Sequence, residues 1–463
     1  MKRFAALLLA VAIHATAAVQ PVQIATFVVD ATPPIGSPLC HGHIPPAKQT
    51  EDRLSARGLV LMIPEQKPIV LATVDWVGNY NEGYDAWREA LATAAGTIAD
   101  RVTMHALHQH DAPGFDLTSE AILTEHGTAG VECNIRHARQ VIADAAAALR
   151  DAMKKPVPVT HAGVAAGKVE QFASNRRILG PDGKVKFVRY SACRNAEVRA
   201  APEGIIDPMV RVVSFWNREQ PVAVLSYYAT HPQSHYGKGC VSADTVGLAR
   251  SLREAALPGV FHIHFTGAGG NVAAGKYNDG SPENRRLLAE RLVQGMAEAW
   301  KHTHKKSLKP KDIVWKVKST SLPLRDSLTN EASFLKVLND TAAVTRDKVR
   351  SARNLAWARR CKSGHQCEIS ALWLDNIALL HLPGELFVEY QLAAHKLAPE
   401  ATVCLAAYAD GGPGYIGTAE AYGQGGYETG EVSLVRPAVE AVLMDAMREV
   451  LRRASTSGKA EGL

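Results

Sequence analysis

Four hydrophobic, strand-like runs that lie far apart in this chain each end at or near a side chain able to bind a metal ion. These side chains are His108, His231, Glu385 and Tyr415. In an open α/β sheet, ligands gather in the crevice beyond the carboxyl ends of the strands, so side chains from distant segments meet there. Two imidazoles, a carboxylate and a phenol suit a zinc ion with an open coordination position. The pattern therefore predicts a metal-dependent hydrolase.

The N-terminus has the features of a secretory signal peptide. Two basic residues precede the apolar stretch 4–13, and the small residues 15–17 form a cleavage site. The apolar stretch is too short to cross a bilayer, and no later segment is long enough. We therefore expect residues 1–18 to be removed and the protein to be exported, either to the periplasm or out of the cell.

The rest of the chain is predicted to form one domain. The 463 residues are enough for a large core, and we find neither an internal repeat nor a linker rich in Pro or Ser. We expect residues 19–455 to form a single hydrolase domain and residues 456–463 to form a flexible tail. A net charge of +6 is too mild to indicate nucleic-acid binding, and no basic run is interleaved with aromatic residues.

Strand-like segments outnumber helical ones in the middle of the chain, and regular alternation of strand and helix is absent. This favours an α/β fold of layered, mixed β-sheets flanked by helices over a barrel or a doubly wound parallel sheet. The polar, helical segment 331–360 is expected to be a peripheral cover.

The chain has seven cysteines. In an oxidising compartment, the close pair Cys361 and Cys367 is the expected disulfide, closing a small loop before a strand. The odd count leaves at least one thiol unpaired, and a buried, inert thiol is its expected state.

The most polar of the strand ends contains a His-x-His pattern. Residues two apart on an extended strand end face the same way, so His108 and His110 project together, and Asp111 could orient an imidazole. Surface histidines on a loop are the alternative interpretation. The same pattern recurs at 41–43 and at 262–264, and the second of these lies inside a strand, where core histidines are expected.

Two glycine-rich segments follow predicted strands. The segment 267–272 lacks the lysine of a phosphate-binding loop, and the segment 412–417 matches the dinucleotide spacing but runs into further glycines instead of a continuous helix. Glycines there indicate close backbone approach. The chain has no Gly-x-Ser-x-Gly elbow, which counts against an ordinary serine hydrolase.

An ordered series of short motifs resembles the catalytic domain of the neutral/alkaline non-lysosomal ceramidase family. The matching pieces span about 34–428 and include LHQHDAP, Asn175-Arg176-Arg177, YYATHPQS, VSADTVG, GAGGNV, LPGE and GYIGTAEAYGQGGYE. Each motif is modest, but together their order and spacing are specific. The resemblance implies a fold like that of the neutral ceramidase catalytic domain.

The resemblance also implies roles for single residues. It assigns zinc binding to His108, His231, Glu385 and Tyr415, the four side chains that the strand-end pattern selects. It also places His110 and Arg176 beside the scissile amide and Tyr427 at another active-site position. In the mechanism that we expect, His110 would protonate the leaving amine, and Arg176 and Tyr427 would stabilise the developing oxyanion. Zinc would acidify a water molecule and polarise the carbonyl group.

Three departures from the family pattern affect the expected substrate. Ala273 stands where ceramidases have a serine that contacts the substrate head group, and Ala274 replaces the proline that follows it. Asp111-Ala112-Pro113 replaces the usual Ser-Gly-Pro. We also expect the C-terminal immunoglobulin-like domain of the family to be missing. These departures weaken the expectation of ceramide itself more than that of the fold.

The predicted function is zinc-dependent hydrolysis of an amide, in an N-acyl lipid similar to ceramide or in a related acylated amine. Transient contact with a membrane surface is compatible with a lipid substrate. Two alternatives remain open: a zinc-dependent esterase or deacylase acting on a small soluble substrate, and a non-catalytic exported module that binds a metal or ligand.

Overall fold

The computed structural model describes residues 20–453 of the chain. The expected signal peptide, residues 1–18, and the expected tail, residues 456–463, lie outside the described residues, so both stay predictions. Within the described part of the chain, no helix is both long enough and apolar enough to cross a membrane.

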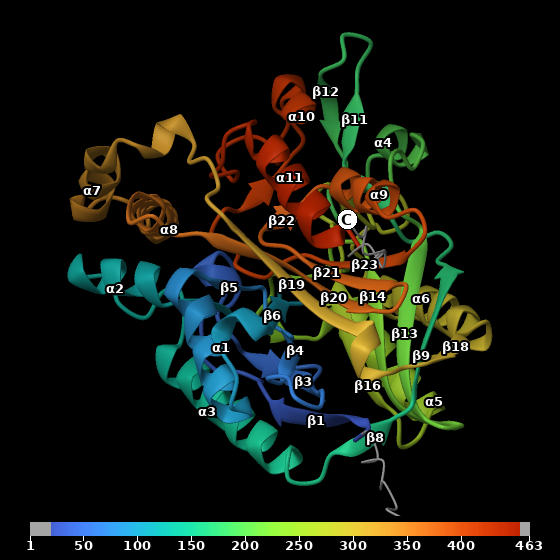
Figure 1. Ribbon diagram of the computed structural model, residues 1–463. Coiled ribbons are helices and arrows are strands. Elements are labelled where there is room, and N and C mark those ends of the chain that lie inside the picture. Colours follow the sequence, from blue (N-terminus) through green and yellow to red (C-terminus); the bar gives the residue numbers. More distant parts are fainter. Residues whose placement is uncertain (1–19, 454–463) are drawn as a thin grey trace, which may run out of the picture.

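The first large sheet has the strand order β6-β4-β3-β1-β8 (Figure 1). Neighbouring strands are antiparallel except β4 and β6, which run parallel. Helices α1 and α3 pack together against this sheet. The bounds are β1 Val22–Asp30, β3 Ser55–Met62, β4 Ile69–Val74, β6 Val102–Ala106, β8 Val157–Val159, α1 Asn81–Ala95 and α3 Ile135–Ala152.

The second large sheet has the order β16-β14-β13-β9-β18 and is covered by α5 and α6. Only β14 and β16 are parallel to each other in this sheet. The bounds are β9 His161–Lys168, β13 Met209–Asn217, β14 Gln220–Tyr228, β16 Phe261–Thr266, β18 His304–Ser307, α5 Asp244–Ala256 and α6 Glu283–Lys301.

The third large sheet has the order β19-β20-β21-β23, with β21 and β23 parallel. Helices α9 and α11 pack against it. The bounds are β19 Ile313–Thr320, β20 Cys367–Leu374, β21 Ile377–His381, β23 Thr402–Ala406, α9 Val388–Leu397 and α11 Val439–Leu451.

The three sheets share a central apolar core. Strand β3 has an almost continuously hydrophobic sequence because both of its faces are buried. Leu59 and Leu61 join this central core, whereas Val60 on the opposite face joins the core beneath α1 and α3. A strand that is buried on both faces has no solvent side to alternate with. The predicted layered α/β fold with mixed sheets is confirmed.

Each of the three large sheets contains one parallel pair of strands connected through a helix. The carboxyl ends of these three pairs meet. The pairs are β4/β6 through α1, β14/β16 through α5, and β21/β23 through α9. The amide of Ala106 donates to the carbonyl of Tyr408 (3.0 Å), and the amide of Ala407 donates to the carbonyl of Thr266 (2.9 Å). The three βαβ units therefore direct the loops after their strands toward one place.

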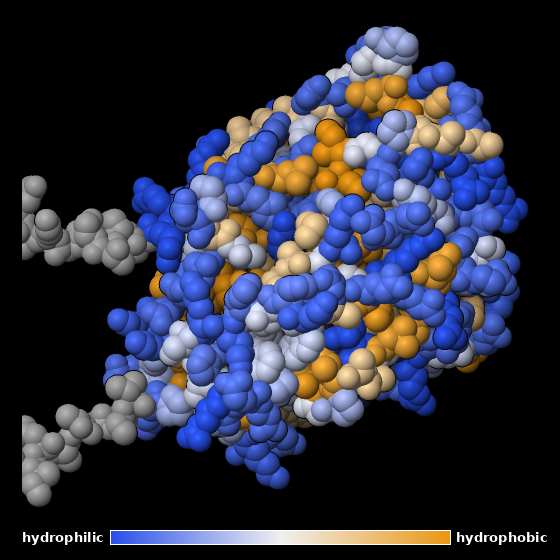
Figure 2. Space-filling view, turned by 90° about the vertical axis from the view of Figure 1, so that its right-hand side faces the viewer, coloured by the Kyte–Doolittle hydropathy of each residue, from blue (hydrophilic) through white to orange (hydrophobic). Residues whose placement is uncertain are grey.

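The remaining α-helices and strands lie in the connections between the elements of the three large sheets. They are β2 Gln49–Thr50, β5 Gly78–Tyr80, β7 Gly114–Asp116, α2 Leu117–Glu125, β10 Ser174–Asn175, β11 Arg177–Leu179, β12 Val185–Val188, α4 Ala196–Ala200, β15 Cys240–Val241, β17 Val272–Ala273, α7 Glu331–Asn339, α8 Thr345–Lys362, β22 Glu385–Leu386, β24 Tyr415–Ile416 and α10 Ala419–Gln424. Helices α7 and α8 form the predicted helical segment and pack with α2 to one side of the sheets (Figure 1). On another face, hydrophobic residues lie in several separate patches between hydrophilic ones (Figure 2).

The predicted disulfide between Cys361 and Cys367 is wrong, because all seven cysteines are free thiols. Cys361 lies in the last turn of α8 and Cys367 begins β20, and the neighbour of the Cys367 sulfur is His365 Nε2 at 3.8 Å. His365 Nε2 also lies 3.7 Å from Asp410 Oδ2, whose charge is already balanced by Arg360 at 3.5 Å.

Candidate metal centre and active-site cavity

The first predicted ligand, His108, follows β6 by two residues and is fixed by the backbone of the neighbouring loop. Its Nδ1 lies 2.6 Å from the carbonyl oxygen of Val77, and its own amide donates to the carbonyl of Trp76. A carbonyl can only accept a hydrogen bond, so Nδ1 carries the proton and Nε2 of the neutral ring presents a lone pair. His108 has a φ of 74°, and the ring of Tyr408 stacks on its imidazole at 4.4 Å.

The second ligand, His231, follows β14 by three residues and is oriented in the same way. Its Nδ1 lies 2.6 Å from the carbonyl oxygen of Gly269. A Cβ atom on Gly269 would lie 2.8 Å from the backbone of Thr230, so only glycine permits this approach. The segment 267–272 is therefore not a phosphate loop; it brings a carbonyl group to the back of the histidine.

Glu385 and Tyr415 lie side by side on two short parallel strands. Strand β22 pairs with β24 in a register that sets Glu385 opposite Tyr415. Gly384 precedes the carboxylate with a φ of 68°, and a side chain there would meet the carbonyl of Gly414 at 2.8 Å. The second glycine-rich segment, 412–417, wraps around Tyr415 and presents its phenol.

The four side chains converge on one point. Nε2 of His108 and Nε2 of His231 lie 3.1 and 3.2 Å from Oε2 of Glu385, and Nε2 of His231 lies 3.1 Å from the hydroxyl of Tyr415. Ligands at zinc distances of about 2.0–2.2 Å and tetrahedral angles stand roughly 3.3–3.6 Å apart. Two imidazole lone pairs facing a carboxylate repel unless a cation lies between them. The donor set thus fits a metal ion.

Burial lowers the pKa of His231 to about 4, which favours its neutral ring. Burial opposes ionisation of Glu385, but positive charge and hydrogen bonding at the positions of His108 and His231 outweigh it, so the pKa of the carboxyl lies well below its ordinary value. A cation bound beside the carboxylate would act on Glu385 in the same direction. Burial and the nearby Glu385 raise the pKa of the Tyr415 phenol.

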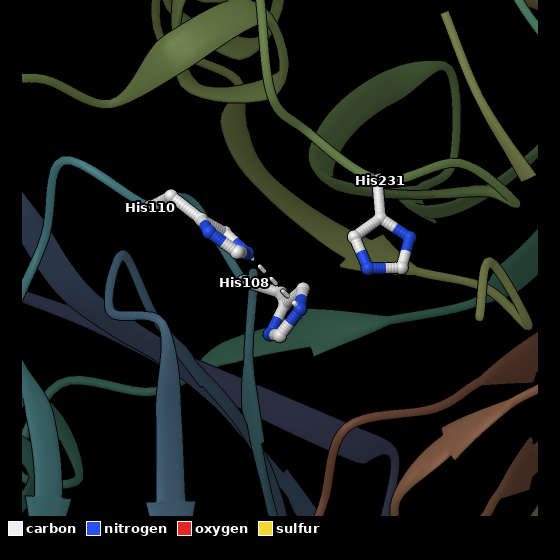
Figure 3. Close-up of side chains that lie close together, drawn as sticks. All are labelled: His108, His110 and His231. Carbon is white, nitrogen blue, oxygen red and sulfur yellow. Dashed lines mark hydrogen bonds between the residues drawn. The ribbon is translucent and has the colours of Figure 1, made fainter. Parts of the chain in front are cut away.

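His110 lies beside the four converging side chains, and its imidazole is turned toward His108 (Figure 3). The two Nε2 atoms are 3.4 Å apart, and Nδ1 of His110 lies 3.5 Å from the sulfur of Cys40. Burial, followed by the charges of His108 and His231, lowers the pKa of His110 well below its ordinary value. The three histidines also form a compact group that could hold a metal ion, so the ring of His110 lies within reach of the same ion.

Arg176 and Tyr427 complete the predicted set on the opposite side of the centre. Nη1 of Arg176 donates to the Tyr415 hydroxyl at 3.1 Å and approaches Nε2 of His231 at 3.5 Å. Its Nε pairs with Glu428 at 3.2 Å, a fully buried carboxylate that also pairs with Arg177 at 3.3 Å. The guanidinium of Arg176 lies 5.5 Å from the centre of the Tyr427 ring. All seven predicted site residues are therefore brought together.

Five of these seven residues line a cavity of about 290 Å³: His108, His110, Glu385, Tyr415 and Tyr427. Backbone strain concentrates in its wall, because the lining residues Cys40, His41, Asn81 and His108 have φ angles of 46°, 54°, 52° and 74°. Non-glycine residues in this region cost of the order of 1–3 kcal/mol each and cluster at functional sites.

Three predictions around the site need correction. Asp111 does not orient an imidazole: its Oδ1 accepts from the amide of Gly237, and backbone carbonyls orient His108 and His231 instead. Ala273 is fully buried in β17, opposite Ser174, and is not among the residues that line the cavity. Helix α8 is no mere peripheral cover, since it forms one wall of the cavity.

The predicted core histidines are confirmed, since His262 and His264 are buried in β16. Sequence reasoning missed the carbonyls of Val77 and Gly269, which no residue type marks. It also missed Glu428, although this carboxylate directly follows Tyr427. Sequence reasoning also missed the cavity-lining arginines of α8, Arg346, Arg350 and Arg353. Their spacing of four and three residues, which places them on one face of a helix, could have indicated them.

We compared the chain with known proteins. No family model matches the sequence, and no curated protein matches it. Among solved structures, it is similar to a ceramidase described as complexed with C2, with a TM-score of 0.69 and 16% identity over 93% of this chain and 75% of that one. It is also similar to the neutral ceramidase from Pseudomonas aeruginosa, with a TM-score of 0.67 and 16% identity over 93% of this chain and 74% of that one. The protein therefore has the neutral ceramidase fold.

Proposed function

We propose that this protein is a metal-dependent amide hydrolase whose zinc ion is held by His108, His231, Glu385 and Tyr415. One observation carries the proposal: two imidazoles, each with Nδ1 bound to a backbone carbonyl, direct their Nε2 lone pairs toward one carboxylate oxygen. That arrangement is repulsive without a cation and favourable with one. A zinc ion held there would acidify water at the site and polarise the amide carbonyl.

The residues around the proposed zinc site have distinct roles in the proposed reaction. His110 has a pKa well below its ordinary value, so it is neutral and accepts a proton from the attacking water. It then delivers this proton to the amide nitrogen, which leaves poorly unless protonated. Arg176 is buried, fixed by Glu428 and directed at the centre, so its guanidinium stabilises negative charge on the carbonyl oxygen. The ring of Tyr427 lies 5.5 Å from this guanidinium, and its hydroxyl would be the second donor to the carbonyl oxygen.

For the substrate, we propose an acylated amine, with an N-acyl lipid similar to ceramide as one member of that class. The fold shared with ceramidases supports this choice. The cavity volume of about 290 Å³ lies just below the usual range of about 300–1,000 Å³. It favours the second candidate function, a zinc-dependent esterase or deacylase acting on a small soluble substrate.

Metal analysis and a substrate panel test the proposal together. Protein purified without added metal should contain close to one zinc ion per chain, and His108→Ala and Glu385→Gln should lose it. His302→Ala is the matched control, because that histidine is exposed and lies at the end of α6. Release of fatty acid should be followed for short and long acyl amides and for the corresponding esters.

The outcomes separate the candidates. Zinc binding with amide cleavage supports the proposed amidase, whereas cleavage of esters alone favours the esterase. Zinc binding without hydrolysis of any acyl compound indicates a non-catalytic module. Full zinc content and activity in His108→Ala would contradict the ligand assignment.

A further inference from the structure

Helix α8 presents three arginines to the cavity that contains the candidate metal centre. Arg346, Arg350 and Arg353 are spaced by four and three residues, which places them on one helical face. All three line the same cavity as His108 and Glu385. The neighbouring face of α8, including the fully buried Val349, packs in a hydrophobic cluster with α2. The helix is thus anchored with its cationic face toward the cavity.

The charges on this wall are only partly neutralised by the protein. Arg350 pairs with Glu431 at 2.9 Å, but the Arg350 side chain is 40% exposed and that of Glu431 is 81% exposed, and pairs this accessible to solvent are weak and easily exchanged. Arg346 has no carboxylate within 4.0 Å among residues 20–453. Both arginines can therefore bind an anion that enters the cavity.

The third arginine is held deeper in the wall. Its guanidinium lies 4.4 Å from the centre of the Tyr80 ring and 3.7 Å from Oε1 of Glu132. Burial and the neighbouring Asp116 raise the pKa of Glu132 well above its ordinary value, so this carboxyl does little to cancel the charge of Arg353. Arg353 therefore adds a third guanidinium group to a cavity that the acidic residues Asp116, Glu385 and Glu431 also line.

A histidine on the same cavity wall responds to all three arginines. The pKa of His43 is lowered to about 4, first by burial and then by the charges of Arg353, Arg346 and Arg350. His43 itself lines the cavity. The three guanidinium groups therefore act on one shared space and are not dispersed over the outer surface of the helix.

We propose that the α8 wall binds an anionic group of the substrate, so that the preferred substrate is an acylated amine carrying a carboxylate or a similar anion. Guanidinium groups match the planar, two-oxygen geometry of carboxylates and phosphates. In this arrangement the amide lies at the metal centre beside His110, and the anion lies against Arg346 and Arg350. The inference rests on the proposed amide hydrolase and narrows its substrate class.

A pair of substrates that differ only in charge provides the test. N-Hexanoylglycine carries a carboxylate where N-hexanoylglycinamide carries a neutral carboxamide, and release of hexanoate is measured for both with the zinc-loaded full chain. We expect kcat/KM to be about tenfold higher or more for the charged substrate, as is typical of a charge-assisted contact. Raising the salt concentration should reduce this ratio, because part of the cavity wall is exposed.

Substitution of the arginines shows whether α8 is responsible. The ratio should fall close to one in the double variant Arg346→Gln/Arg350→Gln, and should fall partway in Arg346→Gln alone. Arg359→Gln is the matched control, because Arg359 lies on the same helix, is exposed and does not line the cavity. It should keep the ratio of the unmodified protein. Zinc content and melting temperature verify that each variant is folded.

The results distinguish this inference from the proposed function. Hydrolysis of both amides at equal rates, or a ratio that the double variant leaves unchanged, would overturn the inference while leaving the hydrolase intact. If neither amide is cleaved, the proposed function fails, and calorimetric binding of the two compounds decides the inference. Preferential binding of N-hexanoylglycine that the double variant loses supports it, and equal binding overturns it.

Discussion

Replacing Glu385 by glutamine should weaken zinc binding with almost no change in the shape of the site. Glutamine keeps one oxygen and the volume of the side chain, but it removes the negative charge that faces both imidazoles at 3.1 and 3.2 Å. Side chains that only support metal ligands typically contribute about 10–100-fold in metal affinity. A direct, charged ligand should contribute at least the upper value, about 100-fold.

The stability of the protein reports this change without any assay of activity. At a free zinc concentration about 1,000 times the dissociation constant, binding stabilises the folded state by about 4.1 kcal/mol. Unfolding entropies of roughly 2.1 cal/mol/K per residue imply roughly 0.9 kcal/mol/K for residues 20–453. Zinc should therefore raise the melting temperature of the unmodified protein by about 4–5 °C.

The variant should respond much less at the same zinc concentration. A 100-fold weaker site is then only about tenfold above its dissociation constant, which gives about 1.4 kcal/mol and a shift of about 1.5 °C. Thermal unfolding is followed by circular dichroism or calorimetry, with each protein measured with zinc and after treatment with a chelator. Any direct effect of the substitution on the metal-free fold cancels in this difference. Equal zinc-induced shifts in the two proteins would refute the assignment of Glu385 as a ligand.

Three further predictions concern single residues. His110→Ala should lower the rate of amide cleavage by about 10²–10⁴-fold but affect an activated aryl ester much less, because an aryl oxide leaves without protonation; an equal loss on both substrates would contradict its role as proton donor. Arg176→Gln should lower kcat by about 10²–10³-fold with zinc content retained, and a change confined to KM would count against stabilisation of the oxyanion. Burial lowers the pKa of His264 to about 3, so below about pH 6.5 this residue binds more protons in the unfolded chain than in the folded one. The free energy of unfolding should therefore decrease as the pH is lowered, by up to about 1.4 kcal/mol per pH unit. Urea unfolding at pH 7 and pH 5 should show a smaller fall for His264→Gln, and an identical fall would contradict this explanation.

The fold could be predicted from the sequence where the signal was local and strong. Segments such as Ser55–Met62 and Phe261–Thr266 are hydrophobic, short and bounded by turns, and they form strands as expected. The amphipathic segment Ile135–Ala152 forms the expected helix. Local patterns of this kind depend only on which faces of an element are buried.

Predictions that inferred a contact from closeness in the sequence were wrong. The spacing of Cys361 and Cys367 favoured a disulfide, but the helix end and the strand start that carry them leave His365 beside the Cys367 sulfur. Asp111 was expected to orient a histidine because it is adjacent in sequence, yet its carboxylate turns to the backbone of Gly237. Neighbours in sequence compete with groups that only folding brings near.

The sequence by itself determined which residues could form the metal centre, because each strand must end and the polar residue after it must leave the core. The identity of His108, His231, Glu385 and Tyr415 was readable for that reason. Only the tertiary structure decided how these side chains are oriented, since the carbonyls of Val77 and Gly269 that hold the imidazoles belong to other loops. It also decided that α8 lines the cavity with its arginines, because the packing of α8 on α2, remote in sequence, determines which face of α8 is turned toward the cavity.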